Sequence, residues 1–289
     1  MKKKEKPSHT ALKVGLNIIA LSHIEEMKNV LPDGIVSATS DLLKSSKAVN
    51  TKRIEKHHSP NIVKLYKIFD WMLPGQFEVF GYRKAFFEER VLDAIEHGAS
   101  QVLVLGCGYD TLCYRLASKY PQVKFFEIDH PNTAISKLEG LVKLGKSNNH
   151  FVIPEDLSKK TLSEVLGAND SWNKTEKTII TAEGLLQYLP PSSVQNLFEQ
   201  CSKITGDKSR IAFTYVGKGS DGRPYAGPRT GLMLWLLKIS GEPWLWAANL
   251  NELKELLFSS GWQYSEKLTG ENIKRGIEYF ACAIKNKED

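Results

Sequence analysis

After Gly98 the chain alternates short runs rich in β-branched and aromatic residues with longer amphipathic stretches. Strands that alternate with helices in this way pair in parallel through right-handed crossovers. The rhythm therefore predicts an α/β protein with a Rossmann-like, doubly wound and mostly parallel sheet. Its strands are expected at Gln101–Leu105, Val123–Ile128, His150–Ile153, Thr178–Thr181 and Arg210–Val216.

The segment before this alternation is different, because its apolar residues recur at helical spacing. Ile18, Leu21 and Ile24 follow that spacing, and a later helix from about Phe77 ends at Gly98, which suits the position just after a helix. We therefore expect a helical extension over residues 1–98.

Residues 99–289 are then predicted to form the Rossmann-like core, with a loop and helix insertion at about 217–248. The insertion begins with a stretch rich in glycine and proline, residues 217–228, which reads as a loop. We considered a lid over the sheet and a plain surface loop for it. Helices are expected at Leu232–Ile239 and Leu250–Ser259, and late strands at Trp262–Leu268 and Ile277–Ala283.

Composition limits the possible partners. The chain is 289 residues long, with 42% hydrophobic and 25% charged residues, as in ordinary globular proteins. Its formal net charge is +6, and part of the surplus lies in the N-terminal run Lys2, Lys3, Lys4 and Lys6. No interleaved basic and aromatic pattern suggests a nucleic-acid partner, and no apolar stretch is long enough to span a membrane.

The four cysteines, Cys107, Cys113, Cys201 and Cys282, form no pair with the spacing of a zinc site or a disulfide framework. We therefore expect reduced thiols, no metal, and a cytoplasmic location. The oligomeric state is left open.

The run from Val102 to Asp110 is an apolar strand followed by Gly106 and Gly108 and then a helix. Glycines allow a ligand to approach the backbone closely, and the N-terminus of the following helix favours an anionic group. A nucleotide-like cofactor fits such a turn. A tight strand-to-helix turn without a ligand remains the alternative.

The second predicted strand ends in Asp129, roughly 20 residues after Gly106, where a carboxylate can accept hydrogen bonds from both hydroxyls of a ribose. NAD and S-adenosyl-L-methionine both carry such a ribose. Thr111 occupies the position of the third glycine of the dinucleotide fingerprint, so the usual binding position for a pyrophosphate is missing. The pattern therefore favours methyl transfer over nicotinamide chemistry.

Four motifs in order give the chain a resemblance to the leucine carboxyl methyltransferase family. The C-terminal runs Gly241-Glu-Pro243 and Gly261-Trp262 are also similar to that family, and the likeness covers roughly residues 80 to 265. The four motifs are Leu105-Gly-Cys-Gly-Tyr-Asp-Thr-Leu-Cys-Tyr-Arg-Leu116, Phe126-Glu-Ile-Asp-His-Pro131, Pro154-Glu-Asp156-Leu157 and Thr181-Ala-Glu183-Gly-Leu-Leu-Gln-Tyr-Leu189.

The resemblance implies a fold of the class I methyltransferase type with S-adenosyl-L-methionine as cofactor. It implies that Gly106, with Gly108 in the same turn, lies against the methionine part of the cofactor, and that Asp129 binds the ribose. Asp156 and the backbone of Leu157 would read the adenine, whose amine needs an acceptor.

The resemblance also places Glu183 at the amino acid end of the cofactor. Arg83 is the best match to an arginine that holds the cofactor carboxylate, although the residues around it depart from the family pattern. Simpler roles stay open: Asp156 and Asp110 could each cap a helix, and Glu183 and Tyr188 could serve solvation and core packing.

The function expected from the resemblance is O-methylation, with a carboxylate of a small molecule or a protein C-terminus as acceptor. A carboxylate is already ionised at neutral pH, so no general base is needed, and no residue stands out as one. Arg83 and Tyr188 are our candidates for orienting the acceptor. A nicotinamide-dependent oxidoreductase and a non-catalytic cofactor-binding protein are the alternative functions.

Overall fold

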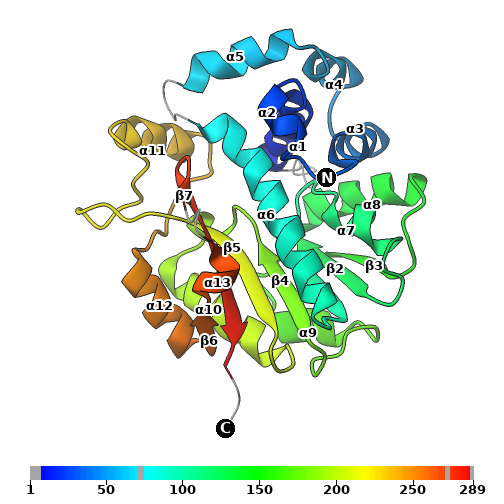
Figure 1. Ribbon diagram of the computed structural model, residues 1–289, viewed down its shortest axis with the longest axis vertical. Coiled ribbons are helices and arrows are strands. Elements are labelled where there is room, and N and C mark those ends of the chain that lie inside the picture. Colours follow the sequence, from blue (N-terminus) through cyan, green and yellow to red (C-terminus); the bar gives the residue numbers. More distant parts are fainter. Residues whose placement is uncertain (1–7, 71–74, 271–273, 287–289) are drawn as a thin grey trace, which may run out of the picture.

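A computed structural model describes residues 8–70, 75–270 and 274–286. An eight-stranded sheet runs through the middle of the molecule, with helices on both faces and a group of helices at one end (Figure 1). The sheet order is β3-β2-β1-β4-β5-β8-β6, and β7 pairs with β8. The strands are β1 (Gln101–Leu105), β2 (Lys124–Asp129), β3 (His150–Pro154), β4 (Thr178–Ala182), β5 (Arg210–Val216), β6 (Trp262–Tyr264), β7 (Lys274–Arg275) and β8 (Glu278–Lys285).

Strands β1 to β5 are parallel, and β8 runs antiparallel to β5, β6 and β7. The inner parallel strands β1, β4 and β5 are almost entirely buried because helices cover both faces. The doubly wound α/β fold predicted from the sequence is confirmed. Strand order reverses at β1, whose neighbours are β2 and β4, so a ligand site is expected beyond the carboxyl ends of these strands.

The helices fall into three groups along the chain. Before the sheet come α1 (His9–Leu21), α2 (Glu25–Lys28), α3 (Ile35–Ser45), α4 (Thr51–His57), α5 (Asn61–Asp70) and α6 (Gln76–Glu96). Between strands lie α7 (Leu112–Ala117), α8 (Pro131–Lys143), α9 (Leu162–Gly167), the 3-10 turn η1 (Leu186–Tyr188) and α10 (Pro191–Lys203). Later come α11 (Thr230–Ile239), α12 (Leu250–Ser259) and α13 (Glu266–Thr269).

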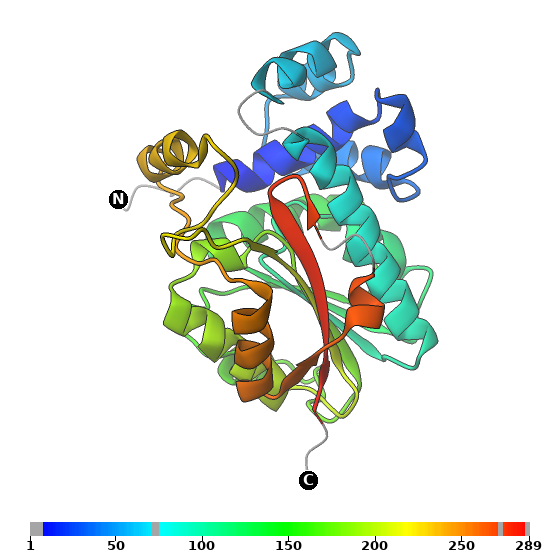
Figure 2. The ribbon, with the colours of Figure 1, turned by 60° about the vertical axis from the view of Figure 1, so that its left-hand side comes forward.

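The predicted boundary at residue 98 falls between α6 and β1, but α6 does not stand apart from the core. Phe87, Val91 and Ala94 of this helix are buried with Val102 and Val104 of β1. Figure 2 shows α6 lying along the sheet, while α1 to α5 gather beyond its end. The long helix therefore ties the N-terminal helices to the sheet.

One predicted late strand is wrong beyond its first three residues. The sequence Trp262–Leu268 was expected to be a single strand, yet β6 ends at Tyr264 and α13 follows. The Ser265 side chain accepts a hydrogen bond from the Leu268 backbone N–H, which caps the new helix. A serine cap therefore overrides the β-rich composition here.

Candidate functional site

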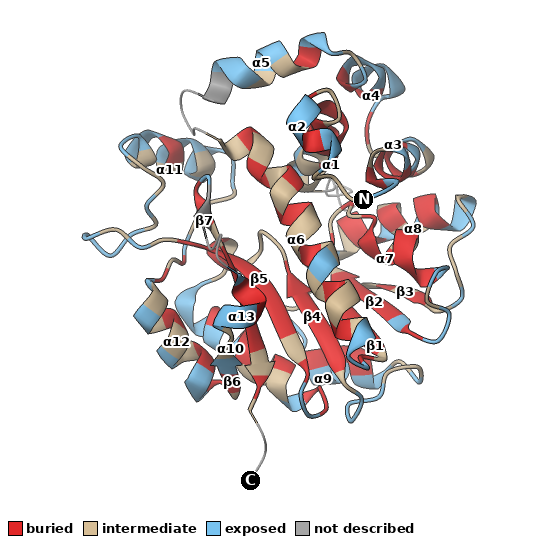
Figure 3. Cartoon of the chain, viewed as in Figure 1, coloured by how far each residue is buried: buried red, intermediate tan, exposed pale blue. Residues whose placement is uncertain are grey.

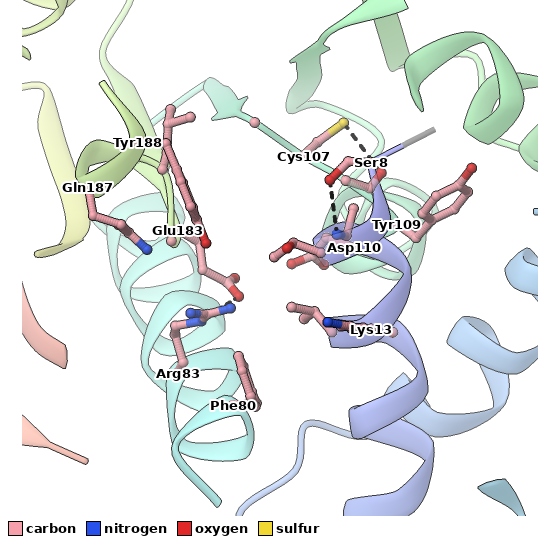
Figure 4. A pocket seen from close by; sticks show the side chains of 18 of the residues that line it. Ser8, Lys13, Phe80, Arg83, Cys107, Tyr109, Asp110, Glu183, Gln187 and Tyr188 are labelled. Atoms are coloured by element: carbon pink, nitrogen blue, oxygen red, sulfur yellow. Dashed lines mark hydrogen bonds and ion pairs between the residues drawn. The ribbon is translucent and has the colours of Figure 1, made fainter. Parts of the chain in front are cut away.

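A cavity of about 900 Å³ opens at the carboxyl ends of β1, β2 and β4, where the topology places it. Its sheet side consists of the glycine turn after β1, Asp129 at the end of β2 and Glu183 just after β4. Its helical side comes from α1, α6, α11 and the segment 241–245. Figure 4 shows Arg83 and Glu183 pointing toward one another, with Lys13 across the cavity.

The glycine turn has a backbone shape that other residues rarely adopt. Gly106 and Gly108 have φ values of 67° and 47°. A Cβ on Gly106 would lie 3.2 Å from the Leu185 side chain, and one on Gly108 would lie 3.1 Å from Ala11. The turn therefore combines a positive φ with close packing, and its backbone reaches the cavity directly.

Asp129 faces this turn. One carboxylate oxygen accepts a hydrogen bond from the Gly108 N–H at 2.6 Å, and the other accepts from the His130 N–H at 2.7 Å. Burial raises the pKa of Asp129, although these two N–H groups and Lys137 oppose the shift. A carboxylate has about four acceptor positions, so two remain for the hydroxyls of a ribose.

A buried network of charged side chains lies between α6 and β4 and forms the floor of the cavity. The Arg83 guanidinium donates to Glu183 at 2.8 Å and to both oxygens of Glu278 at 2.8 and 2.9 Å. Lys84 Nζ lies 2.9 Å from the Glu183 carboxylate and also contacts Asp110. The five side chains therefore alternate in sign from Glu278 to Asp110.

The ion pairs of this network favour the charged forms of Arg83 and Asp110. Burial alone would lower the pKa of Arg83, but the Glu278 and Glu183 carboxylates outweigh it and raise the pKa. Burial alone would raise the pKa of Asp110, but Lys84 and Lys137 hold it well below its usual value. Asp110 also accepts from the Leu112 N–H at 2.7 Å, so it bonds the first turn of α7 from the position before Thr111, which is the N-cap residue.

Carboxylates outnumber cations around the cavity. The acidic lining residues are Asp110, Asp129, Glu183, Glu242 and Glu278, whereas the basic ones are Lys13, Arg83 and Lys84. This excess of two negative charges suits a ligand with more positive than negative groups. S-adenosyl-L-methionine has a sulfonium, an ammonium and one carboxylate, whereas the pyrophosphate of NAD adds negative charge. The lining therefore fits the first cofactor better.

Asp156 and Leu157 lie near this site but are absent from the described lining of the cavity. They follow β3, whose Pro154 is paired with Asp129. Asp156 accepts from the Ser158 N–H and hydroxyl at 3.0 and 2.6 Å and pairs with Lys159, and these bonds lower its pKa to about 2. These bonds stabilise a turn and not a helix, because α9 begins at Leu162 with Thr161 as its cap, so the helix-capping alternative for Asp156 is wrong and its role toward adenine stays a prediction.

Tyr188 lies on the cavity wall, where burial raises its pKa. The predicted lid, residues 217–228, does not contribute to the described lining. It folds back on itself instead, with the Gly219 N–H donating to Arg223 and the Tyr225 N–H to Gly217, both at 2.8 Å. The part of the chain that follows this loop does line the cavity, through Met233 and Leu237 of α11.

Sequence reasoning missed Lys84, Glu278, Lys13 and Glu242. Glu278 had one available signal, because an acid within an apolar strand is expected to have a buried partner. Thr10 of α1 contacts the Glu242 carboxylate, a pairing across more than 200 residues that no local pattern indicates.

A second buried cluster lies beneath the glycine turn. Lys137 Nζ is 2.8 Å from the Glu127 carboxylate, and His150 Nε2 is 3.3 Å from the same carboxylate. Ligand atoms of Cys113, Glu127 and His150 lie within 4.8 Å of one another, which a metal could use. Lys137 already supplies a positive charge there, so we treat the cluster as structural. All four cysteines are buried, free thiols.

Relatives of the chain are proteins named as methyltransferases. A protein of Mycobacterium sp. (strain JLS), named as a candidate S-adenosyl-L-methionine-dependent methyltransferase, is 32% identical over 48% of this chain and 45% of its own length. YktD of Bacillus subtilis, named in the same way, is 28% identical over 72% of this chain and 68% of its own length. The chain thus matches less than half of the mycobacterial relative.

A similar solved structure is that of a candidate methyltransferase from Thermobifida fusca, with a TM-score of 0.60 and 16% identity over 91% of this chain and 98% of the other. At that identity the likeness shows the fold, which is that of class I methyltransferases. The sequence model of the leucine carboxyl methyltransferase family matches residues 37–202, more than half of the chain and including the glycine turn, Asp129 and Glu183. The protein therefore belongs to the leucine carboxyl methyltransferase family.

Proposed function

We propose that the protein transfers a methyl group from S-adenosyl-L-methionine to a carboxylate of a small molecule or a protein C-terminus. The observation that carries the cofactor part is the acidic cavity at the strand ends, which joins the glycine turn to Asp129 and to the Arg83 network. Family membership and the names of the relatives support methyl transfer.

The residues present could hold each part of this cofactor. Asp129 would accept from the ribose hydroxyls, and Gly106 and Gly108 would leave room for the sugar and the methionine part. Glu183 would meet the ammonium group, while Arg83 would meet the carboxylate. When bound, the cofactor supplies an electrophilic methyl group on a sulfonium.

Methyl transfer is an in-line displacement, so the protein must align the acceptor oxygen about 3 Å from the methyl carbon and exclude water. Tyr188, Met233 and Leu237 line the cavity and would surround an acceptor. A buried tyrosine with a raised pKa stays protonated at neutral pH, so Tyr188 could donate a hydrogen bond but would not act as a base.

The choice of a carboxylate acceptor is supported by Lys13 of α1. Arg83, our other candidate for orienting the acceptor, is assigned here to the cofactor carboxylate, and Lys84 pairs with Glu183, whereas Lys13 lines the cavity and has no ion pair with any described residue. A cation that is not neutralised by the protein can pair with the acceptor. No general base is required, because a carboxylate with an ordinary pKa is ionised above about pH 6.

The test uses the stability of the product. The protein is incubated with methyl-labelled S-adenosyl-L-methionine and a cell extract, and the pH of the product is then raised. A methyl ester is cleaved by hydroxide, so labelled methanol should be released, and the rate of methyl transfer should be nearly independent of pH above about 6. Label that stays on the product after base treatment would exclude carboxyl methylation and point to phenolic or nitrogen acceptors.

The role proposed for Lys13 is tested with the variant Lys13→Met. Lys203→Met, on the exposed surface of α10, is the control. Loss of the Lys13 charge should raise KM for the acceptor roughly tenfold, because a charge-assisted hydrogen bond is worth about 1.5 to 3 kcal/mol. Cofactor affinity should be unchanged. An unchanged KM would show that the acceptor carboxylate binds elsewhere.

A further inference from the structure

Exposed apolar side chains are concentrated on one short part of the surface. Of the eleven large hydrophobic residues that are exposed in the described part of the chain, six lie between residues 225 and 245. Single exposed hydrophobic residues are normal, but a contiguous group usually marks an interaction site. The six are Tyr225, Leu232, Trp235, Leu236, Ile239 and Leu245.

Four of these residues, Leu232, Trp235, Leu236 and Ile239, form one face of α11. Their spacing of three and four residues places them along a single stripe of the helix. Trp235 is 57% exposed and Ile239 is 65% exposed, whereas Met233 is the buried residue of this helix. Figure 3 shows α11 at the edge of the molecule, largely exposed or half-buried. The stripe therefore has no covering element in the described structure.

The same helix borders the cavity with a neighbouring face. Met233 and Leu237 line the cavity, and they lie about 130° around the helix from the centre of the exposed stripe. Whatever covers the stripe is therefore placed beside the cavity wall that Met233 and Leu237 form.

The charged residues within and next to α11 are basic, although Asp221 and Glu242 lie just outside this segment. Residues 225–241 include Arg229 and Lys238, both exposed, and contain no Asp or Glu. The whole chain carries a formal charge of +6. A partner that complements this surface would combine an apolar layer with negative charge.

The area of the exposed stripe distinguishes between the partners that could cover it. A stable protein–protein contact buries about 800 Å² on each partner, which is more than four half-exposed side chains on a ten-residue helix provide. A helix that lies in a bilayer interface needs only one apolar face and flanking basic residues. Tryptophan is favoured at that depth.

We propose that α11 docks the protein on the surface of an anionic lipid bilayer, with Leu232, Trp235, Leu236 and Ile239 inserted among the acyl chains and Lys238 at the headgroups. No helix of the described residues is long and apolar enough to cross a membrane. The expectation of no membrane partner was drawn from spanning segments alone, and surface attachment revises it.

The test measures cosedimentation of the full chain with vesicles of phosphatidylcholine and with vesicles that also contain phosphatidylglycerol. The full chain should bind the anionic vesicles and bind them less at high salt, because salt screens the attraction. Tryptophan fluorescence should be quenched by brominated acyl chains. Absence of binding to the anionic vesicles would overturn the proposal.

The double variant Trp235→Ser/Ile239→Ser should bind these vesicles about tenfold more weakly or worse, because both side chains would lose their burial in the acyl layer. Its control is Phe258→Ser on α12, which removes a side chain that is 72% exposed outside the stripe and should leave binding unchanged. Thermal unfolding of both variants confirms that they fold.

The role of the Lys238 charge is tested by Lys238→Glu, which should weaken binding to anionic vesicles severalfold. The control is Lys203→Glu on α10, which makes the same change of charge away from α11 and should weaken binding less. Equal binding by the double variant and the wild type would contradict the proposal. So would a dimer in sedimentation velocity that the double variant abolishes, because a second copy would then cover the stripe.

Discussion

The two sides of the cavity differ in how they are built. The sheet side comes from short segments directly after β1, β2 and β4, and its polar groups are held by backbone N–H groups or by buried ion pairs. With α6 counted on the sheet side because Arg83 is paired there, the helical side comes from α1, α11 and the segment 241–245, joined by the contact between Thr10 and Glu242. The comparison suggests a fixed cofactor side and a more adjustable acceptor side.

The largest effect is expected at Arg83, whose side chain is 5% exposed. Replacing it in Arg83→Met leaves the buried Glu278 without its ion-pair partner and Glu183 with Lys84 alone, which should lower the free energy of unfolding by about 3 to 5 kcal/mol. The control Arg223→Met removes an exposed pair with Asp221 and should cost at most about 1 kcal/mol. Urea unfolding measures both. Equal losses would show that the network does not stabilise the sheet side.

The next effect is on the cofactor. Asp129→Ala removes the acceptor proposed for two ribose hydroxyls and the partner of the Gly108 N–H. Charge-assisted hydrogen bonds contribute about 1.5 to 3 kcal/mol each, so affinity for S-adenosylhomocysteine should fall by roughly one to three orders of magnitude. Asp207→Ala, an exposed residue before β5, is the calorimetric control. Unchanged affinity in Asp129→Ala would place the ribose elsewhere.

A smaller effect is expected on the helical side. Glu242→Gln weakens the contact with Thr10 that joins α1 to the segment 241–245. We expect roughly a tenfold or smaller increase in the cofactor dissociation rate, measured by stopped-flow displacement, because one partly exposed hydrogen bond is lost. Hydrogen exchange of residues 8–21 should rise as well. An effect as large as that of Asp129→Ala would contradict the distinction between the two sides.

The smallest effect concerns pH. Burial raises the pKa of Asp129, so its carboxylate should gain a proton at a higher pH than an exposed aspartate does. A protonated carboxyl accepts fewer hydrogen bonds, and cofactor affinity should therefore fall as the pH is lowered through that raised pKa. Calorimetry between about pH 4 and 7 follows this loss. In Asp129→Asn this pH dependence should disappear, and its persistence would assign it to another group.

The same difference between the two sides explains what the sequence could predict. Strands β1 and β5 begin and end at the predicted residues, because apolar runs between polar turns are local signals. Asp129 could be found because it ends β2, where a carboxylate for a ribose is expected, whereas Glu183 was implied by the family resemblance.

The contacts between distant segments had no local signal on either side of the cavity. Glu278 reaches Arg83 across 195 positions, and Thr10 reaches Glu242 across 232, so only the tertiary fold brings them together. The strand predicted at Trp262–Leu268 was wrong after Tyr264 because a single serine cap decided the local structure. Residues 217–228 have loop composition, but their composition did not show that α11, which follows them, lines the cavity.

The central claim is that the acidic cavity at the strand ends binds S-adenosyl-L-methionine. Titration calorimetry of the full chain with S-adenosyl-L-methionine, S-adenosylhomocysteine and NAD tests it most directly. The account predicts binding of the first two and no measurable binding of NAD, because Thr111 replaces the third glycine of the dinucleotide turn and the lining carries an excess of two negative charges. Comparable affinity for NAD would contradict it.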